Sequence, residues 1–292
     1  MHRTDAGPTL AQLVSLAAVT IVVAAMAVFW SGIQVRGLSE PAGVVAIFSL
    51  VAWLRPAFRY CMASFAVYVA FSTAFIVLLY ALGTSGWPLA DQGLAPFDTL
   101  LGIDANRIAA ETSARPLFEK AMYLIYFTAI PQTIFLIVWM GFRHDPRLGL
   151  FLYRYMICGL LTAACFYVVP ALGAAGSETT AWNAAAARDL LALRSGELTT
   201  LDCTATAGIV TFPSFHVIWA ILLMLAMPNP FMIGLNVLMI VSAVTSGGHY
   251  VIDVVGAGLV CGFVVPMTAR RFATGTKAAA STVSDESQFA SA

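Results

Sequence analysis

Residues 249–268 read HYVIDVVGAGLVCGFVVPMT, and Asp253 is the only charged residue among them. A helix needs roughly 20 mainly apolar residues to cross the hydrocarbon core of a bilayer. We therefore expect residues 249–268 to form a membrane-spanning helix. A carboxylate inside such a helix is costly, so Asp253 also marks a candidate functional position.

Working outward from this helix, the same criterion finds seven further segments in the chain. They are Leu10–Trp30, Pro41–Leu54, Tyr60–Leu82, Leu117–Phe142, Leu148–Leu172, Pro213–Met227 and Pro230–Gly247. The composition agrees, since 60% of the residues are hydrophobic and only 10% are charged, against roughly 25% in soluble proteins. The sequence predicts an all-α, polytopic transmembrane bundle of about eight spans.

Two polar stretches interrupt the series of apolar segments, and a tail follows the last of them. The first polar stretch contains the candidate amphipathic helix Thr99–Ala114, and the second contains Ala181–Arg194. We interpret the chain as one integral membrane domain. Its parts are the N-terminal helices 1–83, an outer loop 84–116, a core 117–271 and a disordered cytoplasmic tail 272–292.

The distribution of basic residues predicts the orientation. With the N-terminus inside, short inner segments carry most of the arginines near helix ends, as the positive-inside rule requires. We expect both termini in the cytoplasm and both polar stretches outside, in a bacterial inner membrane with the site facing the periplasm. Fifteen basic and fifteen acidic residues cancel, so no nucleic-acid partner is expected.

Two of the four histidines, His216 and His249, lie at the start of apolar segments, where ionisable groups are rare and often functional. The helices that carry them run in the same direction, because one helix separates them. Both imidazoles should therefore lie at the same, outer, membrane edge.

The residues around these histidines suit an anionic ligand. Asp253 follows His249 by four residues, so it can hold one ring nitrogen and leave the other as a nucleophile. Pro213 suits a helix start, whose free N–H groups attract anions. The Gly247–Gly248 pair lets a ligand approach the backbone closely.

Other interpretations of these residues exist. Each histidine could be a solvated helix end, and a histidine–aspartate pair could simply neutralise itself in a packed interface. A zinc site is disfavoured because the three possible ligands, His216, His249 and Asp253, have no Cys or Glu nearby. The five cysteines show neither disulfide nor metal-type spacing and are interpreted as structural.

Two motifs resemble the type-2 phosphatidate phosphatase superfamily. Residues 213–216, PSFH, resemble its second motif, P-S-G-H, and residues 242–253, SAVTSGGHYVID, match the Ser, His and Asp of its third motif, S-R-x5-H-x3-D. The phenylalanine in the second motif is more similar to the branch of inositol phosphorylceramide synthases and sphingomyelin synthases. The resemblance covers Leu117 to Thr268 and implies a six-helix lipid phosphatase-type core.

The chain departs from the family pattern at two positions. Ala243 stands where the third motif has an arginine, and Ile108 stands where the first motif, K-x6-R-P, requires lysine ahead of Arg115–Pro116. Another basic residue must then meet the phosphate, since an arginine fork suits phosphate oxygens. The candidate substrate-binding residues are Arg194 first, then Arg115, Lys120 and Arg188, together with Ser214 and Gly248.

The resemblance implies a membrane enzyme that is either a lipid phosphate phosphatase or a phosphotransferase. In that mechanism His249 attacks phosphorus and forms a phosphohistidine, Asp253 orients His249, and His216 protonates the leaving group. No metal or other cofactor is implied, the partners are membrane lipids, and the acceptor is water or a lipid alcohol. The alternative from another class is a non-catalytic transporter or lipid-binding scaffold whose histidines bind protons or anions.

Overall fold

The computed structural model describes residues 7–176 and 181–289. Its helices are α1 (Leu10–Ser31), α2 (Ser39–Leu54), α3 (Arg59–Gly83), α4 (Asp91–Leu100), α5 (Ala105–Ser113), α6 (Pro116–Tyr126), α7 (Ala129–Phe142), α8 (Pro146–Val168), α9 (Ala181–Ser195), α10 (Phe215–Ala226), α11 (Pro230–Thr245) and α12 (Val251–Phe289). Two short strands, β1 (Gln34–Arg36) and β2 (Thr200–Asp202), pair in parallel. The predicted all-α architecture is confirmed.

Five helical segments of the described chain are long and apolar enough to cross a membrane. They are Leu10–Ser31, Pro56–Gly83, Pro116–Phe142, Pro146–Val168 and Val251–Phe272. The predicted spans of α2, α10 and α11 correspond to shorter apolar helices. Large apolar side chains such as Phe29 and Trp30 are more than four-fifths exposed, as expected for surfaces that face lipid. The exact number of crossings stays a prediction.

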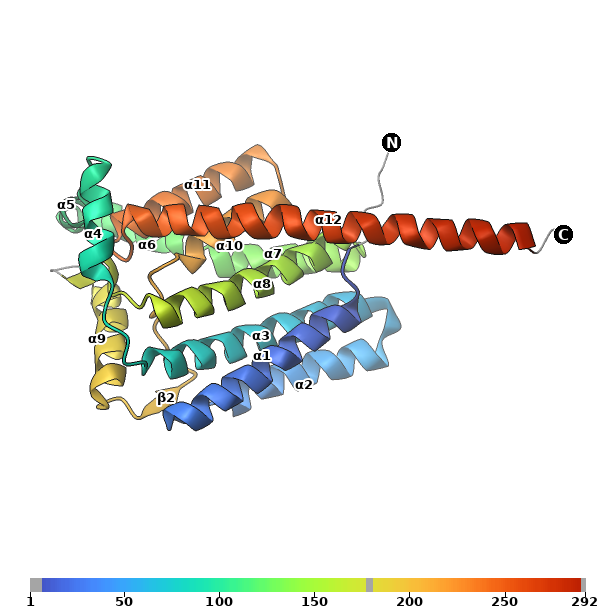
Figure 1. The fold of residues 1–292 in the computed structure, drawn as a ribbon, viewed down its shortest axis with the longest axis horizontal. Helices are drawn as coiled ribbons and strands as arrows, with labels where there is room; N and C mark the ends of the chain where they lie inside the picture. The colour runs from blue at the N-terminus through green and yellow to red at the C-terminus, as the bar shows by residue number, and fades with distance from the viewer. Residues whose placement is uncertain (1–6, 177–180, 290–292) are drawn as a thin grey trace.

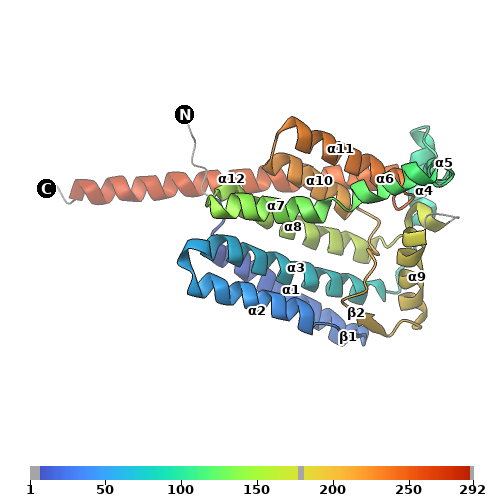
Figure 2. The ribbon, with the colours of Figure 1, turned by 180° about the vertical axis from the view of Figure 1, so that it is seen from behind.

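The bundle has two distinct ends (Figures 1 and 2). Helices α4, α5 and α9 lie across one end, where α12 also begins, whereas α1 begins and α12 ends at the opposite end. Both polar stretches of the sequence therefore lie on the same side of the bundle. The helices α3, α8 and α10 lie inside the bundle and supply most of its core, including Phe71, Phe166 and Leu223.

The apolar segment Leu117–Phe142, which the sequence predicts as one helix, is broken into α6 and α7. Pro131 lies in the first turn of α7, and a proline ring clashes with the carbonyl group four residues earlier, here that of Phe127. The chain turns at Phe127 and Thr128, and the Thr128 hydroxyl donates to the Ile125 carbonyl oxygen at 2.6 Å. This break places Tyr126 at the end of α6.

The boundaries of the last helix also differ from the expectation. α12 begins at Val251, so His249 precedes the helix instead of lying in its first turn. At the other end, α12 is assigned as far as Phe289. The disorder of the tail from residue 272 stays a prediction.

The helices around the candidate site are joined by buried side-chain hydrogen bonds. The Trp219 indole on α10 donates to the Thr133 hydroxyl on α7 at 2.8 Å. The Asn236 amide on α11 donates to the Gln132 side-chain oxygen on α7 at 2.7 Å. Such bonds hold apolar helices in register where lipid offers no other partner.

Candidate active site

The starts of α10 and α12 are joined directly. Ser214 caps α10, because its hydroxyl accepts from the backbone N–H of Val217 at 3.4 Å, and its own backbone N–H donates to the carbonyl oxygen of Asp253 at 3.2 Å. Gly256 on α12 permits this approach, since a Cβ there would lie 2.9 Å from the ring of Phe212. The segment that carries the second motif therefore lies against the helix that follows the third.

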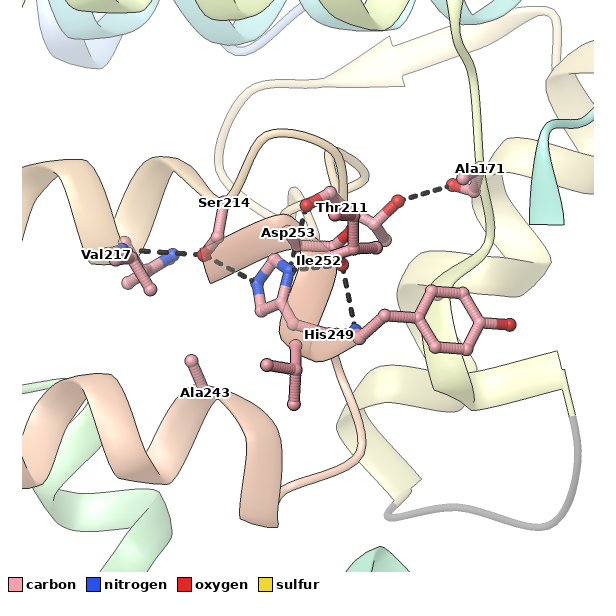
Figure 3. Close-up of polar contacts among 12 residues, drawn as sticks. Ala171, Thr211, Ser214, Val217, Ala243, His249, Ile252 and Asp253 are labelled. Atoms are coloured by element: carbon pink, nitrogen blue, oxygen red, sulfur yellow. Dashed lines mark hydrogen bonds and ion pairs between the residues drawn. The ribbon is translucent and has the colours of Figure 1, made fainter. Parts of the chain in front are cut away.

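His249 is held at both ring nitrogens (Figure 3). Its Nδ1 lies 2.9 Å from the Thr211 carbonyl oxygen and 3.3 Å from Asp253 Oδ2. Its Nε2 lies 3.2 Å from the Ser214 hydroxyl. The imidazole is 3% exposed and Asp253 is fully buried, so the ring has little freedom to turn.

The partners of His249 determine which nitrogen carries the proton. A carbonyl oxygen and a carboxylate oxygen can only accept hydrogen bonds, so Nδ1 of His249 must be the donor. In the neutral ring Nε2 is then the unprotonated nitrogen, and it accepts from the hydroxyl of Ser214. A neutral imidazole with a bare Nε2 is the nucleophilic form.

His216 has a different neighbour. Its Nδ1 lies 2.7 Å from the hydroxyl of Tyr126, and the two rings are stacked with their centroids 3.9 Å apart. Tyr126 is 5% exposed and ends α6, while His216 lies in the first turn of α10, two residues after Ser214. Sequence reasoning missed Tyr126, which is 90 residues from its partner.

Two carboxylates of α4 hold the backbone around His249. Asp98 accepts from the N–H groups of Val251 (2.9 Å) and Ile252 (3.2 Å), so it caps α12. Asp91 accepts from the N–H groups of Leu172 and Gly173 at 3.0 Å. All of these bonds have a carboxylate as acceptor and are charge-assisted, and sequence reasoning missed both aspartates.

Gly173 allows the loop that Asp91 holds, at Leu172 and Gly173, to approach the site closely. It has a φ of +76°, and a Cβ there would lie 2.5 Å from the carbonyl oxygen of Gly248. Only glycine allows this close approach without strain. Gly248, one of the predicted substrate-binding residues, is therefore in contact with the loop that Asp91 holds.

Tyr250, between His249 and α12, lies among these carboxylates. Burial of its side chain and the negative charges of Asp91, Asp253 and Asp98 together raise the pKa of Tyr250 to about 12. The Tyr250 backbone N–H donates to Asp253 Oδ2 at 2.9 Å. Tyr250 therefore stays a neutral phenol, and its backbone helps to fix the Asp253 carboxylate beside His249.

Ala243, which replaces the motif arginine, is fully buried on α11. Figure 3 shows its side chain pointing from α11 toward His249 and Ser214. An arginine at this position would bring a guanidinium group to the site, whereas alanine supplies none. The site therefore receives no cationic side chain from this position of α11.

The basic residues expected to replace that cation lie in different surroundings. The Arg194 guanidinium donates to the backbone carbonyl oxygens of Ser85 (2.8 Å) and Trp87, so it fastens the connection between α3 and α4. Arg188 is exposed and donates to a carbonyl oxygen of its own helix. Arg115 and Lys120 are exposed at the start of α6.

The structure thus brings His249, Asp253 and Ser214 into one hydrogen-bonded group, with Gly248 next to it in the chain. The first choice for the phosphate-binding cation, Arg194, contacts backbone carbonyl groups of the α3–α4 connection instead. Among the described residues, no group of three or more His, Cys, Asp or Glu side chains is arranged to hold a metal ion.

Comparison with known proteins gives the family. No curated protein and no solved structure matches the chain. A family model, the PAP2 superfamily, matches residues 92–267, which is more than half of the chain and includes α4, the cap of α12 and both histidine motifs. The chain therefore belongs to the PAP2 superfamily.

Proposed function

We propose that the protein is a membrane-embedded enzyme that transfers the phosphate group of a lipid phosphate ester to water or to a lipid alcohol. PAP2 superfamily membership supports phosphatase-type activity on phosphate esters. The observation that carries the finer proposal is the geometry of His249, whose Nδ1 faces two acceptors and whose Nε2 faces the hydroxyl of Ser214.

In the proposed first step, Nε2 of His249 attacks phosphorus, the bond between phosphorus and the leaving oxygen breaks, and His216 donates a proton to that oxygen. In the second step, water or an alcohol attacks the phosphohistidine, its proton passes to His216, and Nε2 of His249 is released. Asp253 stabilises the positive charge that develops on the His249 ring.

Ser214 has a part in both steps. In the resting structure its hydroxyl is bound to Nε2 of His249, so an incoming phosphate must displace it. The freed hydroxyl can then donate to a phosphate oxygen, beside the N–H groups at the start of α10. The exposed Arg115 and Lys120 are the remaining basic candidates for the phosphate charge.

We propose that the substrate is amphiphilic, because the site lies at one end of a bundle whose sides are apolar. An outer-face site, in a bacterial inner membrane with both termini in the cytoplasm, follows from the distribution of basic residues. The phenylalanine at position 215 and the alanine at 243 favour a synthase-like branch that uses a lipid alcohol as acceptor.

The test is turnover by the purified protein in detergent or vesicles. Phosphatidic acid, a lipid diphosphate and a lipid phosphodiester are each supplied with and without a long-chain alcohol, and both inorganic phosphate and new lipid esters are measured. We expect turnover of at least one donor by the wild type and none by His249→Ala.

His144→Asn is the matched control for this test. His144 stacks on Tyr60, far from the site, and its φ of +52° is one that asparagine tolerates. This variant should keep wild-type turnover. Full activity in His249→Ala would refute the proposed function.

A further inference from the structure

The two histidines differ in what faces their Nδ1 atoms. For His249 both partners, the Thr211 carbonyl and the Asp253 carboxylate, can only accept a hydrogen bond. For His216 the partner is the hydroxyl of Tyr126, which can accept or donate. His249 must therefore carry a proton on Nδ1, whereas the partner of His216 Nδ1 allows that nitrogen to be protonated or not.

This difference matters because His216, in the proposed function, must both give and take a proton. Its Nδ1 is occupied by Tyr126, so proton exchange with substrate falls to Nε2. The imidazolium form needs an acceptor at Nδ1, and the phenol oxygen of Tyr126 lies 2.7 Å from that atom. A neutral phenol oxygen accepts a hydrogen bond from Nδ1–H but stabilises the positive charge less than a carboxylate would, so the Nε2 proton is given up more readily.

The aromatic ring of Tyr126 also favours the protonated form of His216. Its centroid lies 3.9 Å from that of His216, within the range of about 6 Å over which an aromatic face attracts a cation. Both the hydroxyl and the ring face of Tyr126 favour the protonated form of His216, which is itself half-buried. Tyr126 itself is 5% exposed, so the contact is preformed.

We infer that Tyr126 is a positioning residue that makes His216 a reversible proton carrier, an inference that rests on the proposed function. In the first step, His216 keeps its Nδ1 proton, which is hydrogen-bonded to the Tyr126 oxygen, while the Nε2 proton passes to the leaving oxygen as its bond to phosphorus breaks. In the second step, Nε2 regains a proton from the attacking water or alcohol, and the bond between phosphorus and His249 breaks. The cycle restores the starting protonation of both rings.

The test compares two leaving groups. A nitrophenolate leaves without a proton, whereas an alkoxide needs one, so general acid catalysis matters only for the alkyl ester. The probes are dodecyl phosphate and 4-dodecyl-2-nitrophenyl phosphate, with didodecyl phosphate and dodecyl 4-nitrophenyl phosphate as the diester pair. The measured quantity is kcat/KM for each ester with the full-length protein.

Tyr126→Phe keeps the stacked ring and removes only the hydroxyl. We expect kcat/KM to fall roughly tenfold with the alkyl ester, the loss expected for one hydrogen bond in a transition state, and to change little with the nitrophenyl ester. A purely structural role for Tyr126 would lower both values equally. Tyr123→Phe, one turn earlier on α6 and 40% exposed, is the matched control and should leave both unchanged.

Incorporation of 3,5-difluorotyrosine at position 126 gives a second variant that retains the shape of the side chain. Fluorine makes the neutral phenol oxygen a weaker acceptor, so at a pH where this phenol stays protonated the alkyl-ester rate should fall between those of wild type and Tyr126→Phe. Equal losses with both leaving groups, or no loss with either, would overturn the inference.

The same experiment separates the two claims. If His249→Ala is inactive while Tyr126→Phe behaves like Tyr123→Phe, only the role of Tyr126 is refuted. If His249→Ala turns over the esters at the wild-type rate, or the wild type turns over none of them, the proposed function itself fails, and the inference fails with it.

Discussion

Replacing Asp98 by alanine tests whether α4 holds the start of α12 in place. The Asp98 carboxylate is 3% exposed and accepts from two backbone N–H groups, those of Val251 and Ile252. A buried donor left without an acceptor costs about 1–3 kcal/mol, and loss of a helix cap alone costs about 0.5–2 kcal/mol. We therefore expect Asp98→Ala to lower the free energy of unfolding by about 2–4 kcal/mol.

Activity should fall as well, because the affected turn lies between His249 and Asp253. A loss of about 1.4 kcal/mol in the alignment of this pair corresponds to a tenfold lower rate, so we expect at least roughly a tenfold fall in kcat. The assay combines thermal unfolding in detergent with turnover of a lipid phosphate at a temperature where the variant is folded.

Asp104→Ala is the matched control, since Asp104 caps α5 through the Arg107 N–H at 3.0 Å but is solvent-exposed in that role. This variant should lose about 1 kcal/mol and keep its activity. If Asp98→Ala is no less stable and no less active than Asp104→Ala, then α4 does not position the α12 start.

Three further predictions concern single side chains. Ser214→Ala should lower the free energy of unfolding by about 1 kcal/mol through loss of the α10 cap, and it should also reduce turnover. Its control is Asn229→Ala, which removes the cap of α11 and should affect stability alone. Arg194→Ala should lower the unfolding temperature without changing KM for the lipid phosphate, because its guanidinium binds carbonyl oxygens; a large rise in KM would return it to the phosphate site. The rate of turnover by His216→Ala should be about 10²–10⁴-fold lower than that of the wild type with an alkyl ester, and the loss should be far smaller with a nitrophenyl ester. Equal losses of rate with the two esters would show that His216 is not the acid.

The parts of the site that sequence predicted are those whose partners are near in the chain. His249 and Asp253 are four residues apart, and their contact follows from that spacing although α12 begins only at Val251. The link from Ser214 to His249 crosses 35 residues, and it could be anticipated because the two motifs start helices that run in the same direction.

The residues that sequence reasoning missed make contacts across much longer separations. Tyr126 meets His216 across 90 residues, and Asp98 meets Val251 across 153. No periodicity in the sequence encodes either contact. Both depend on how the turn after α6 and the crossing of α4 are placed by the packed bundle, which a single sequence does not reveal.

Arg194 has a different environment from the one that its sequence position suggested. It was expected to bind phosphate because it lies shortly before the second motif, but its guanidinium donates to the carbonyl oxygens of Ser85 and Trp87. An arginine fork satisfies two backbone carbonyls as readily as two phosphate oxygens, so its chemistry alone does not distinguish the two roles. The KM of Arg194→Ala is the measurement that does.

Covalent labelling tests the central claim, that His249 is the nucleophile, most directly. The protein is mixed with a nitrophenyl ester that carries labelled phosphate, quenched rapidly, and examined for label bound to the chain. We expect label on His249 in the wild type, none in His249→Ala, and retained or increased label in His216→Ala, because His216 also assists breakdown of the intermediate. Label that persists in His249→Ala, or that is lost completely from both folded variants, would contradict this claim.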